Sequence, residues 1–269
     1  MHQFCKITSG ELVYYKSTLL DTPHMFTTKA GGVSTGYLSS LNLGSNRGDD
    51  PACVARNYQI IAQELGADAD RITRAKQVHG DEVAVIDEHN VGRGSSKPKF
   101  EGVDAMVTNL PETPLIGYYA DCVLTMLYDP VSRSIGVCHS GWRGTANGIL
   151  PKTVRTMQEA YGAQPENIRA VIGPSIRQCC FETDRDVPDA MQDTMGDAVL
   201  PYIRRASGKY WIDLQGINAA HLRNAGVLHI HDSGICTKCR SEEFWSHRAT
   251  NGKRGVQGGM ILLKREETR

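Results

Sequence analysis

Apolar residues recur at helical spacing in three segments of the chain. The first, Val54–Leu65, follows a cap and first-turn proline in Asp49-Asp50-Pro51 and stops at Gly66. The second, Thr145–Tyr161, needs its proline in or near the first turn to remain helical. The third, Asp213–Gly226, begins on a capping aspartate and ends on a glycine. These patterns predict three helices.

Short apolar runs bounded by turn residues predict strands between and around these helices. They are Glu82–Ile86, Val103–Val107, Leu115–Tyr119, Val123–Tyr128, Ser134–Cys138, Ile168–Ile172, Val227–His231 and Gly258–Leu263. Several neighbours are too close for crossover helices, which favours an α+β fold with mixed β-sheet layers flanked by helices. The polar segment His89–Lys99 predicts a surface loop. We expect a single domain over residues 1–269, with roughly the first 25 residues peripheral.

The composition is that of an ordinary globular protein, with 40% hydrophobic and 22% charged residues. Lys and Arg number 30, as do Asp and Glu, so the formal net charge is 0. A neutral chain has no overall electrostatic attraction for nucleic acid or an anionic membrane. No apolar run approaches the roughly 18 residues of a membrane span. We therefore expect neither a nucleic-acid nor a membrane partner.

The first residues show no charged segment followed by an apolar stretch, so no secretory signal is expected. Eight cysteines in 269 residues are too sparse for a disulfide scaffold. We expect a cytoplasmic protein with reduced thiols. Its cysteines are then core residues, metal ligands or nucleophiles.

Three apolar runs end in polar side chains that suit a metal site. These are Gln77-Val78-His79-Gly80, Tyr119-Ala120-Asp121-Cys122 and the segment from Val137 to Gly144, which includes His139. Two imidazoles and a thiolate would leave one coordination position open, as in catalytic zinc sites. The spacing matches no compact zinc motif, so spacing alone favours three separate core or turn residues over a metal site.

Other motifs carry weaker signals. Cys236-Thr237-Lys238-Cys239 is a redox pair or a pair of loop thiols, because a structural zinc needs a second such pair and Cys179-Cys180 are adjacent. Gly32–Gly36 fits a nucleophile elbow but lacks the strand and helix that the elbow requires. His229 and His231 share one strand face, either lining a site or partly buried.

Blocks along nearly the whole chain resemble the laccase-domain family, also called multicopper polyphenol oxidase-like proteins, which is associated with purine nucleoside phosphorylase activity. The matching blocks are Thr28–Ser34, Asn42–Gly44, Gly48-Asp49, Asn57, Gln77–Gly80, Asp104-Ala105, Ala120–Cys122, His139–Thr145, Ile172–Ile176, Cys180–Glu182 and Phe244–Arg248. The resemblance implies the laccase-domain architecture and zinc on His79, Cys122 and His139. Lys29 stands where the family often has Arg, His247 where it often has Tyr, and Gly252–Gly255 matches the family's Gly-Arg tail imperfectly.

The resemblance also implies an activity. It is phosphorolysis of adenosine, inosine, guanosine and methylthioadenosine to the base and ribose 1-phosphate, with adenosine deamination as a side activity. Phosphorolysis needs an anion site and a means of stabilising the departing purine, whereas deamination needs an activated water. The partners are then nucleosides and phosphate, and we expect a monomer or weak homodimer.

The remaining candidate residues have two interpretations each. Lys29, Arg47 and Arg143 bind phosphate, or they are ordinary surface and packing cations. Asp121, next to Cys122, acts as an acid or base or orients a ligand, or it makes a structural hydrogen bond. The candidate catalytic residues are therefore Cys122, Asp121 and His139.

Several alternatives remain open. A polyphenol oxidase with bound copper is one, although nine histidines are too few for a full set of four coppers once two bind zinc. Cys122 and His139 could form a Cys–His hydrolase. Some similar bacterial proteins are peptidoglycan editing factors, which implies an amidohydrolase acting on a mis-loaded UDP-MurNAc-amino acid. A non-catalytic binding module is the last alternative.

Overall fold

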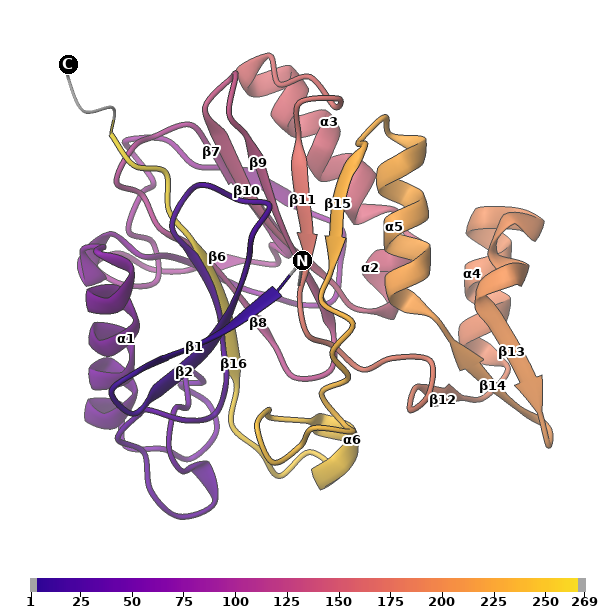
Figure 1. Ribbon diagram of the computed structural model, residues 1–269, viewed down its shortest axis with the longest axis horizontal. Coiled ribbons are helices and arrows are strands. Elements are labelled where there is room, and N and C mark those ends of the chain that lie inside the picture. Colours follow the sequence, from indigo (N-terminus) through magenta and orange to yellow (C-terminus); the bar gives the residue numbers. More distant parts are fainter. Residues whose placement is uncertain (1–3, 266–269) are drawn as a thin grey trace.

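Two β-sheets stacked face to face form the centre of the protein in a computed structural model that describes residues 4–265 (Figure 1). The seven-stranded sheet has the order β1-β2-β3-β16-β8-β4-β6. Its strands are Phe4–Ser9, Leu12–Ser17, His24–Thr27, Gln257–Ile261, Leu115–Tyr119, Thr73–Lys76 and Phe100–Glu101. The six-stranded sheet has the order β15-β11-β9-β10-β7-β5. Its strands are His229–Asp232, Arg169–Ile172, Val123–Asp129, Ser134–Ser140, Ala105–Thr108 and Val83–Val85.

Helices cover the outer faces of both sheets, and a small extension projects beyond them. The α-helices are α1 (Pro51–Leu65), α2 (Trp142–Ala146), α3 (Ile149–Tyr161), α4 (Asp186–Met195), α5 (Leu214–Asn224) and α6 (His247–Thr250). The extension holds α4 and a three-stranded sheet of β12 (Glu182–Thr183), β14 (Lys209–Ile212) and β13 (Ile203–Ala206). Figure 1 shows it to the side of α5, away from the two large sheets.

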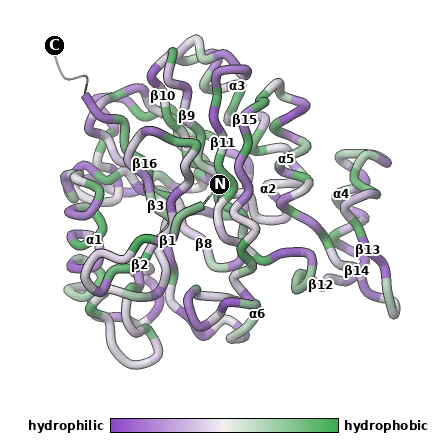
Figure 2. Tube along the Cα trace, viewed as in Figure 1, coloured by the Kyte–Doolittle hydropathy of each residue, from purple (hydrophilic) through white to green (hydrophobic). Residues whose placement is uncertain are grey.

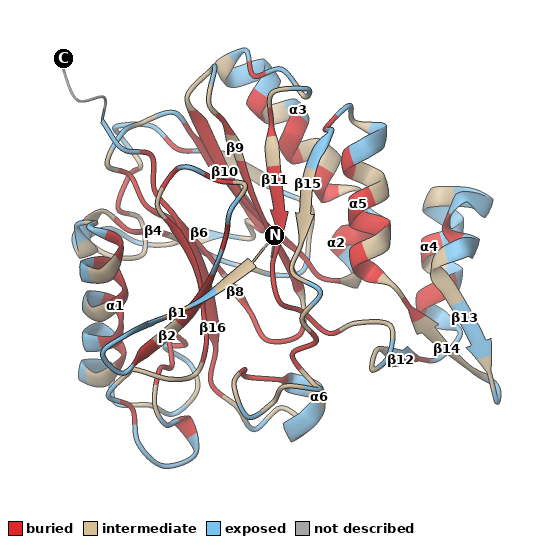
Figure 3. Ribbon diagram, viewed as in Figure 1, coloured by how far each residue is buried: buried red, intermediate tan, exposed pale blue. Residues whose placement is uncertain are grey.

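Alternation along the central strands gives each large sheet two buried faces. Leu124 and Met126 of β9 pack between the two sheets, while Val123 and Leu127 point to the helices on the other side. A strand buried on both faces has a continuous apolar sequence, which is why the apolar run predicted β9. These central strands are buried along their length in Figure 3 and are largely hydrophobic in Figure 2.

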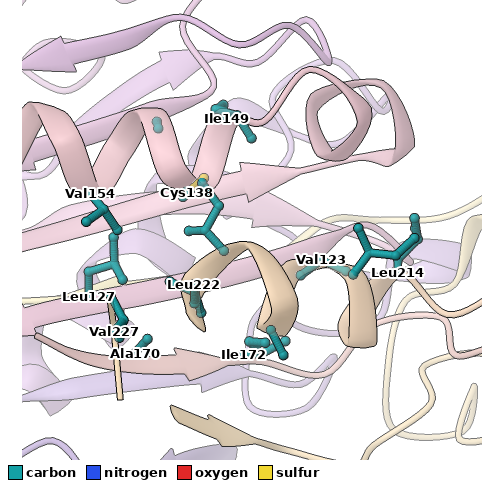
Figure 4. Packing of buried hydrophobic residues seen from close by; sticks show 14 of the residues in the cluster. Val123, Leu127, Cys138, Ile149, Val154, Ala170, Ile172, Leu214, Leu222 and Val227 are labelled. Atoms are coloured by element: carbon teal, nitrogen blue, oxygen red, sulfur yellow. The ribbon is translucent and has the colours of Figure 1, made fainter. Parts of the chain in front are cut away.

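The outer faces bury one stripe of each covering helix. Tyr58 and Ile61 of α1 pack against the seven-stranded sheet at Ile116 and Met260. On the opposite side, helices α3 and α5 pack against the six-stranded sheet. There Val154, Leu222 and Leu127 belong to one buried cluster, drawn in Figure 4. The result is a layered arrangement of helix, sheet, sheet and helices.

The predicted α+β class with mixed sheets flanked by helices is confirmed, and most predicted elements are present. Asp50 caps α1 through the Ala52 N–H at 2.8 Å, and Gly66 ends it with φ 67°. The helix predicted over Thr145–Tyr161 is present as α3 with its proline in the first turn, but it begins later than predicted, because Gly148 adopts φ 71° and separates α2 from α3.

The strands at the start of the chain carried no recognised signal in the sequence. β1 and β2 lie at the edge of the seven-stranded sheet, yet Leu12, Tyr14 and Tyr15 are buried. The small sheet and α4 were also not predicted. The strands of the small sheet are short and half-exposed, so their sequences carry little signal. No helix within residues 4–265 is long and apolar enough to cross a membrane.

Candidate metal centre and active-site pocket

Two histidines and one cysteine meet where three connections leave the sheets. His79 follows β4, Cys122 lies between β8 and β9, and His139 is near the end of β10. Their ligand atoms all lie within 4.8 Å of one another, and Cys122 Sγ is 3.7 Å from His79 Nε2. The sequence placed these residues at the ends of apolar runs, and the structure brings them together.

A buried carboxylate, Asp104, holds two of these residues. His139 Nδ1 is 2.8 Å from Asp104 Oδ1. The same carboxylate accepts hydrogen bonds from the backbone N–H groups of Val78, His79 and Gly80 at 3.1, 3.0 and 2.9 Å. It therefore fixes both the loop that presents His79 and the ring of His139, leaving Nε2 of His139 free to bind a metal.

The electrostatics of the cluster favour a thiolate. Burial raises the pKa of the Cys122 thiol, but the charge and hydrogen bond of His139 outweigh burial and bring it to about 6. Burial lowers the pKa of His139, while the Cys122 thiolate and Asp104 raise it to about 9. Burial raises the pKa of Asp104, and hydrogen bonding to His139 and the backbone brings it to about 2. Without a metal, Cys122 and His139 thus form an ion pair at neutral pH.

The donor set and the space around it fit a zinc ion. Two imidazoles and one thiolate are ligands that Zn²⁺ accepts, and three protein ligands leave a fourth position open. Gly141 leaves the space beside them free, since a Cβ there would lie 2.8 Å from His79 Cδ2 and 3.6 Å from Cys122 Sγ. The three residues can therefore hold a catalytic metal.

Replacing Gly141 with alanine should weaken metal binding. The added methyl would displace the His79 ring, and disturbing groups that orient metal ligands typically costs about 10- to 100-fold in affinity. Competition with a chromophoric zinc chelator measures the change. Gly80→Ala is the matched control, because a Cβ there meets nothing closer than 3.5 Å. Equal affinities for Gly141→Ala and the unaltered protein would contradict this account of the site.

Alkylation of the metal-free protein tests the ion pair. Iodoacetamide labelling of Cys122, followed by peptide mass spectrometry, should be half-maximal near pH 6. An unperturbed thiol has a pKa of about 9.0, so it would reach half-maximal labelling only near that pH. Zinc should protect Cys122 from labelling. A midpoint near pH 9, with or without zinc, would show that the thiol is not paired with His139.

The cluster forms part of the wall of an open cavity of about 360 Å³. This volume lies within the range of small-molecule sites. Leu43, Val256 and Tyr118 contribute apolar surface to the cavity. Gln77 orients this wall by exchanging hydrogen bonds with the backbone N–H and C=O of Tyr118 at 2.7 and 2.9 Å.

Two arginines, Arg47 and Arg254, give the cavity a positive side. Within residues 4–265, the Nε atoms of both are buried and have no hydrogen-bond partner. Burial and the charge of Arg47 lower the pKa of Arg254 to about 10, while the Cys122 thiolate partly opposes this shift. Two adjacent, half-buried cations whose Nε–H groups have no partner suit an anionic ligand, and the charge of Arg254 acts on Cys122.

The other two cations singled out in the sequence do not line this cavity. The Lys29 ammonium donates to the Ser241 carbonyl at 2.7 Å and lies over the Trp245 ring. Arg143 is exposed, with its guanidinium 4.1 Å from the ring centroid of Trp142. The structure therefore places Arg47, but neither Lys29 nor Arg143, in the same cavity as the metal ligands.

Asp121 holds the loop that carries Cys122. It adopts φ 88°, and its carboxylate accepts hydrogen bonds from Thr237 Oγ1 and the Arg248 N–H, both at 2.7 Å. Its backbone carbonyl accepts from the Ile176 N–H at 2.8 Å. These contacts favour the interpretation in which Asp121 makes structural hydrogen bonds.

The sequence interpretation missed two important residues. Asp104 lies in one of the matching blocks but was not predicted as a site residue, since no local pattern marks a carboxylate as the support for a histidine distant in sequence. Arg254 stood in the imperfect Gly252–Gly255 tail and was not selected. Lys99, in the predicted loop, and Lys76 also line the cavity.

The weaker motifs lie elsewhere. Ser34, in the Gly32–Gly36 motif, is buried and hydrogen-bonded to Asp49 and Asn57, whereas a nucleophile must be exposed to substrate. His231 Nδ1 is 2.9 Å from Ser17 Oγ, and neither His229 nor His231 lines the cavity. Within residues 4–265 the only clusters with metal-binding geometry are the His79 group and a four-cysteine group, so no histidine-rich copper cluster accompanies the first.

The four-cysteine group corrects one argument from the sequence. Spacing along the chain offers no second Cys-x-x-Cys pair for Cys236 and Cys239, because Cys179 and Cys180 are adjacent. The structure nevertheless brings Cys179 and Cys180 beside them. Adjacent residues on a turn can direct both sulfurs to one point, which spacing along the chain does not reveal.

Comparisons with known proteins agree with the geometry. Residues 23–264 match the model of the family described as multi-copper polyphenol oxidoreductase laccase. A protein of Deinococcus radiodurans named purine nucleoside phosphorylase is 37% identical over 262 residues, covering 97% of each chain. The Bacillus subtilis protein named purine nucleoside phosphorylase YlmD is 35% identical over 243 residues, covering 89% of this chain and 87% of its own.

Solved structures show the same fold. The crystal structure of YlmD from Geobacillus stearothermophilus has a TM-score of 0.91 at 31% identity, covering 98% of this chain and 100% of its own. That of the Bacillus licheniformis hypothetical protein YfiH has a TM-score of 0.92 at 30% identity, with the same coverage. The chain therefore belongs to the multi-copper polyphenol oxidoreductase laccase family, the family of these purine nucleoside phosphorylases.

Proposed function

We propose that the protein is a zinc-dependent purine nucleoside phosphorylase, which cleaves nucleosides with phosphate to give the free base and ribose 1-phosphate. The observation that carries the proposal is the cavity itself. It places the His79, Cys122 and His139 donors and the cation pair of Arg47 and Arg254 in one space of nucleoside size. The names of the relatives support the same reaction.

The arginine pair binds the phosphate. Arg47 and Arg254 present unpartnered Nε–H groups, and a phosphate dianion would relieve the repulsion between the two half-buried charges. Phosphate oxygen then attacks the anomeric carbon of the ribose, and the bond from that carbon to the purine nitrogen breaks. Its electron pair leaves with the base, which gains the proton that the phosphate dianion gives up, so that neutral base and ribose 1-phosphate are formed. Holding phosphate and nucleoside together supplies much of the acceleration.

The residues around the metal site keep the opposite wall rigid. Asp104 fixes His139 and the His79 loop, and Asp121 fixes the turn that carries Cys122. A zinc ion bound there would supply Lewis acidity at the cavity wall. Leu43, Val256 and Tyr118 offer apolar surface to a purine. Adenosine deamination is proposed as a side activity of this site, because an open metal position suits it.

Turnover before and after metal removal tests the proposal. The protein is stripped with a chelator, reloaded with zinc or copper, and given adenosine, inosine, guanosine or methylthioadenosine with phosphate. We expect free base from the zinc-loaded protein and none from the stripped protein. Full activity without metal would contradict the zinc dependence and favour the Cys–His hydrolase.

Two further substrates separate the remaining alternatives. Oxidation of a phenol by the copper-loaded protein, without nucleoside cleavage by the zinc-loaded one, would favour a polyphenol oxidase. Release of an amino acid from a mis-loaded UDP-MurNAc-amino acid, again without nucleoside cleavage, would favour the editing amidohydrolase. Either result would overturn the proposed function.

A further inference from the structure

Two loops place four thiols at the base of the small extension. Cys179 and Cys180 lie on the turn between β11 and β12, and Cys236 and Cys239 lie on the turn after β15. All four sulfurs lie within 4.8 Å of one another. Cys236 is buried, Cys180 is half-buried, and the outer pair is exposed.

The spacing of the sulfurs matches one tetrahedral metal ion. A zinc–sulfur bond of about 2.3 Å in tetrahedral geometry separates neighbouring sulfurs by about 3.8 Å. Cys179 Sγ lies 3.7 Å from Cys180 Sγ and 3.7 Å from Cys239 Sγ, and Cys180 Sγ lies 3.4 Å from Cys239 Sγ. A disulfide needs about 2.05 Å, and all four cysteines are free.

Backbone contacts hold the two loops in register, so the cluster does not depend on chance side-chain positions. Ser175 and Cys236 form a parallel bridge, in which Ser175 N–H donates to Ile235 at 3.2 Å and Thr237 N–H donates to Ser175 at 3.1 Å. Arg177 then binds Asp232 through two hydrogen bonds of 2.8 and 3.0 Å. These contacts therefore join the two loops that carry the thiols.

Backbone donors also point to the buried sulfur. The backbone N–H groups of Cys239 and Arg177 donate hydrogen bonds to the Cys236 sulfur. Such N–H donors offset the negative charge that builds up when thiolates surround a divalent ion.

We propose that Cys179, Cys180, Cys236 and Cys239 form a second metal site, a structural zinc site separate from the cavity. Four protein thiolates close the coordination shell, so this site has no position for substrate. Binding Zn²⁺ releases the thiol protons to solvent and changes no oxidation state. An all-thiolate tetrahedron selects zinc or iron over harder ions, and sulfurs this close suit a single ion rather than thiolates spread over a multi-iron cluster.

The site would hold the extension against the body of the protein. The chain enters the extension directly after Cys180, at β12. Ile176, three residues before Cys179, and Thr237, between Cys236 and Cys239, both donate hydrogen bonds to Asp121, the residue before Cys122. A metal joining the two loops therefore also steadies the turn that carries a ligand of the first site.

Metal counting on the full-length chain tests the proposal without any activity assay. After dialysis against zinc-free buffer with reductant, we expect about two zinc ions per chain by elemental mass spectrometry. The Cys179→Ser/Cys239→Ser variant should retain about one, because its two substitutions fall on exposed cysteines. The His79→Ala/His139→Ala variant should also retain about one.

Two controls keep the result specific. Cys5→Ser/Cys53→Ser removes two half-buried cysteines outside both clusters and should leave the zinc content unchanged. Cobalt loaded into His79→Ala/His139→Ala should give strong thiolate-to-cobalt charge-transfer absorption, lost when Cys179 and Cys239 are also replaced. This readout holds whether or not nucleosides are cleaved.

Three outcomes would overturn the proposal. The zinc content of Cys179→Ser/Cys239→Ser could equal that of the unaltered protein. A mass spectrum taken without reduction could show a disulfide among the four cysteines, making them a redox pair. Iron could be found in place of zinc.

Discussion

Replacing Asp104 with asparagine should weaken zinc binding at the His79, Cys122 and His139 site by about 10- to 100-fold, the usual cost of losing a partner that orients a metal ligand. The Asp104 carboxylate is hydrogen-bonded to the His139 ring and to three backbone N–H groups. The asparagine amide has only one oxygen besides its NH₂ group. Its NH₂ group would therefore face one of the N–H groups that donate to the Asp104 carboxylate. Chelator competition measures the affinity, and nucleoside cleavage should fall with zinc occupancy.

The same change should lower the free energy of unfolding by about 2–3 kcal/mol, because buried donors lose a charged acceptor. The pKa of Asp104 is lowered from 3.8 to about 2, so its stabilising contribution is complete above pH 3.8. That contribution disappears as the pH falls through about 2. Metal-free protein should therefore show this acid-sensitive stability, and the asparagine variant should not.

Asp129→Asn is the matched control. Asp129 is buried and accepts backbone N–H groups of Val131, Ser132 and Gln164, but it contacts neither metal-site cluster. It should lose comparable stability without losing zinc. If both variants keep full zinc affinity, Asp104 does not position the ligands.

Replacing Arg254 with glutamine should reduce kcat/KM for phosphate by about 10- to 100-fold, the cost of one hydrogen bond to a charged group. The KM for adenosine should change much less. Stability in phosphate-free buffer should hold or rise, since Arg254 is half-buried beside Arg47 and its pKa is lowered to about 10. Added phosphate should raise the Tm of the unaltered protein more than that of the variant.

Arg143→Gln distinguishes the two phosphate assignments. The sequence singled out Arg143, whereas the cavity contains Arg254. A larger loss of phosphate dependence in Arg143→Gln than in Arg254→Gln would return the anion site to the sequence-based position.

Periodicity predicted the central elements because their sequence pattern and burial coincide. β9 is mostly apolar and is buried on both faces, and α1 has both a cap and a terminating glycine. The break at Gly148 was missed because apolar spacing continues across it. β12 to β14 were missed because short, half-exposed strands depend on their partners rather than on their own sequence.

The metal ligands of the candidate site could be predicted, because each is a single residue that the sequence marks. The residues that support them were missed, because their roles depend on contacts with residues distant in the sequence. His79, Cys122 and His139 stood out as polar ends of apolar runs, and the family resemblance selected them. Asp104, Arg254 and the pairing of Cys179 with Cys239 depend on the fold, since each contacts residues from other elements. No spacing rule along the chain identifies such contacts.

The dependence of adenine formation on phosphate tests the proposed function most directly. Zinc-loaded protein is incubated with adenosine over a range of phosphate concentrations, and adenine, inosine and ribose 1-phosphate are quantified together. We predict saturable adenine formation, equimolar with ribose 1-phosphate, and none when phosphate is absent. Adenine formed at a rate independent of phosphate, or inosine as the sole product, would contradict phosphorolysis at this site.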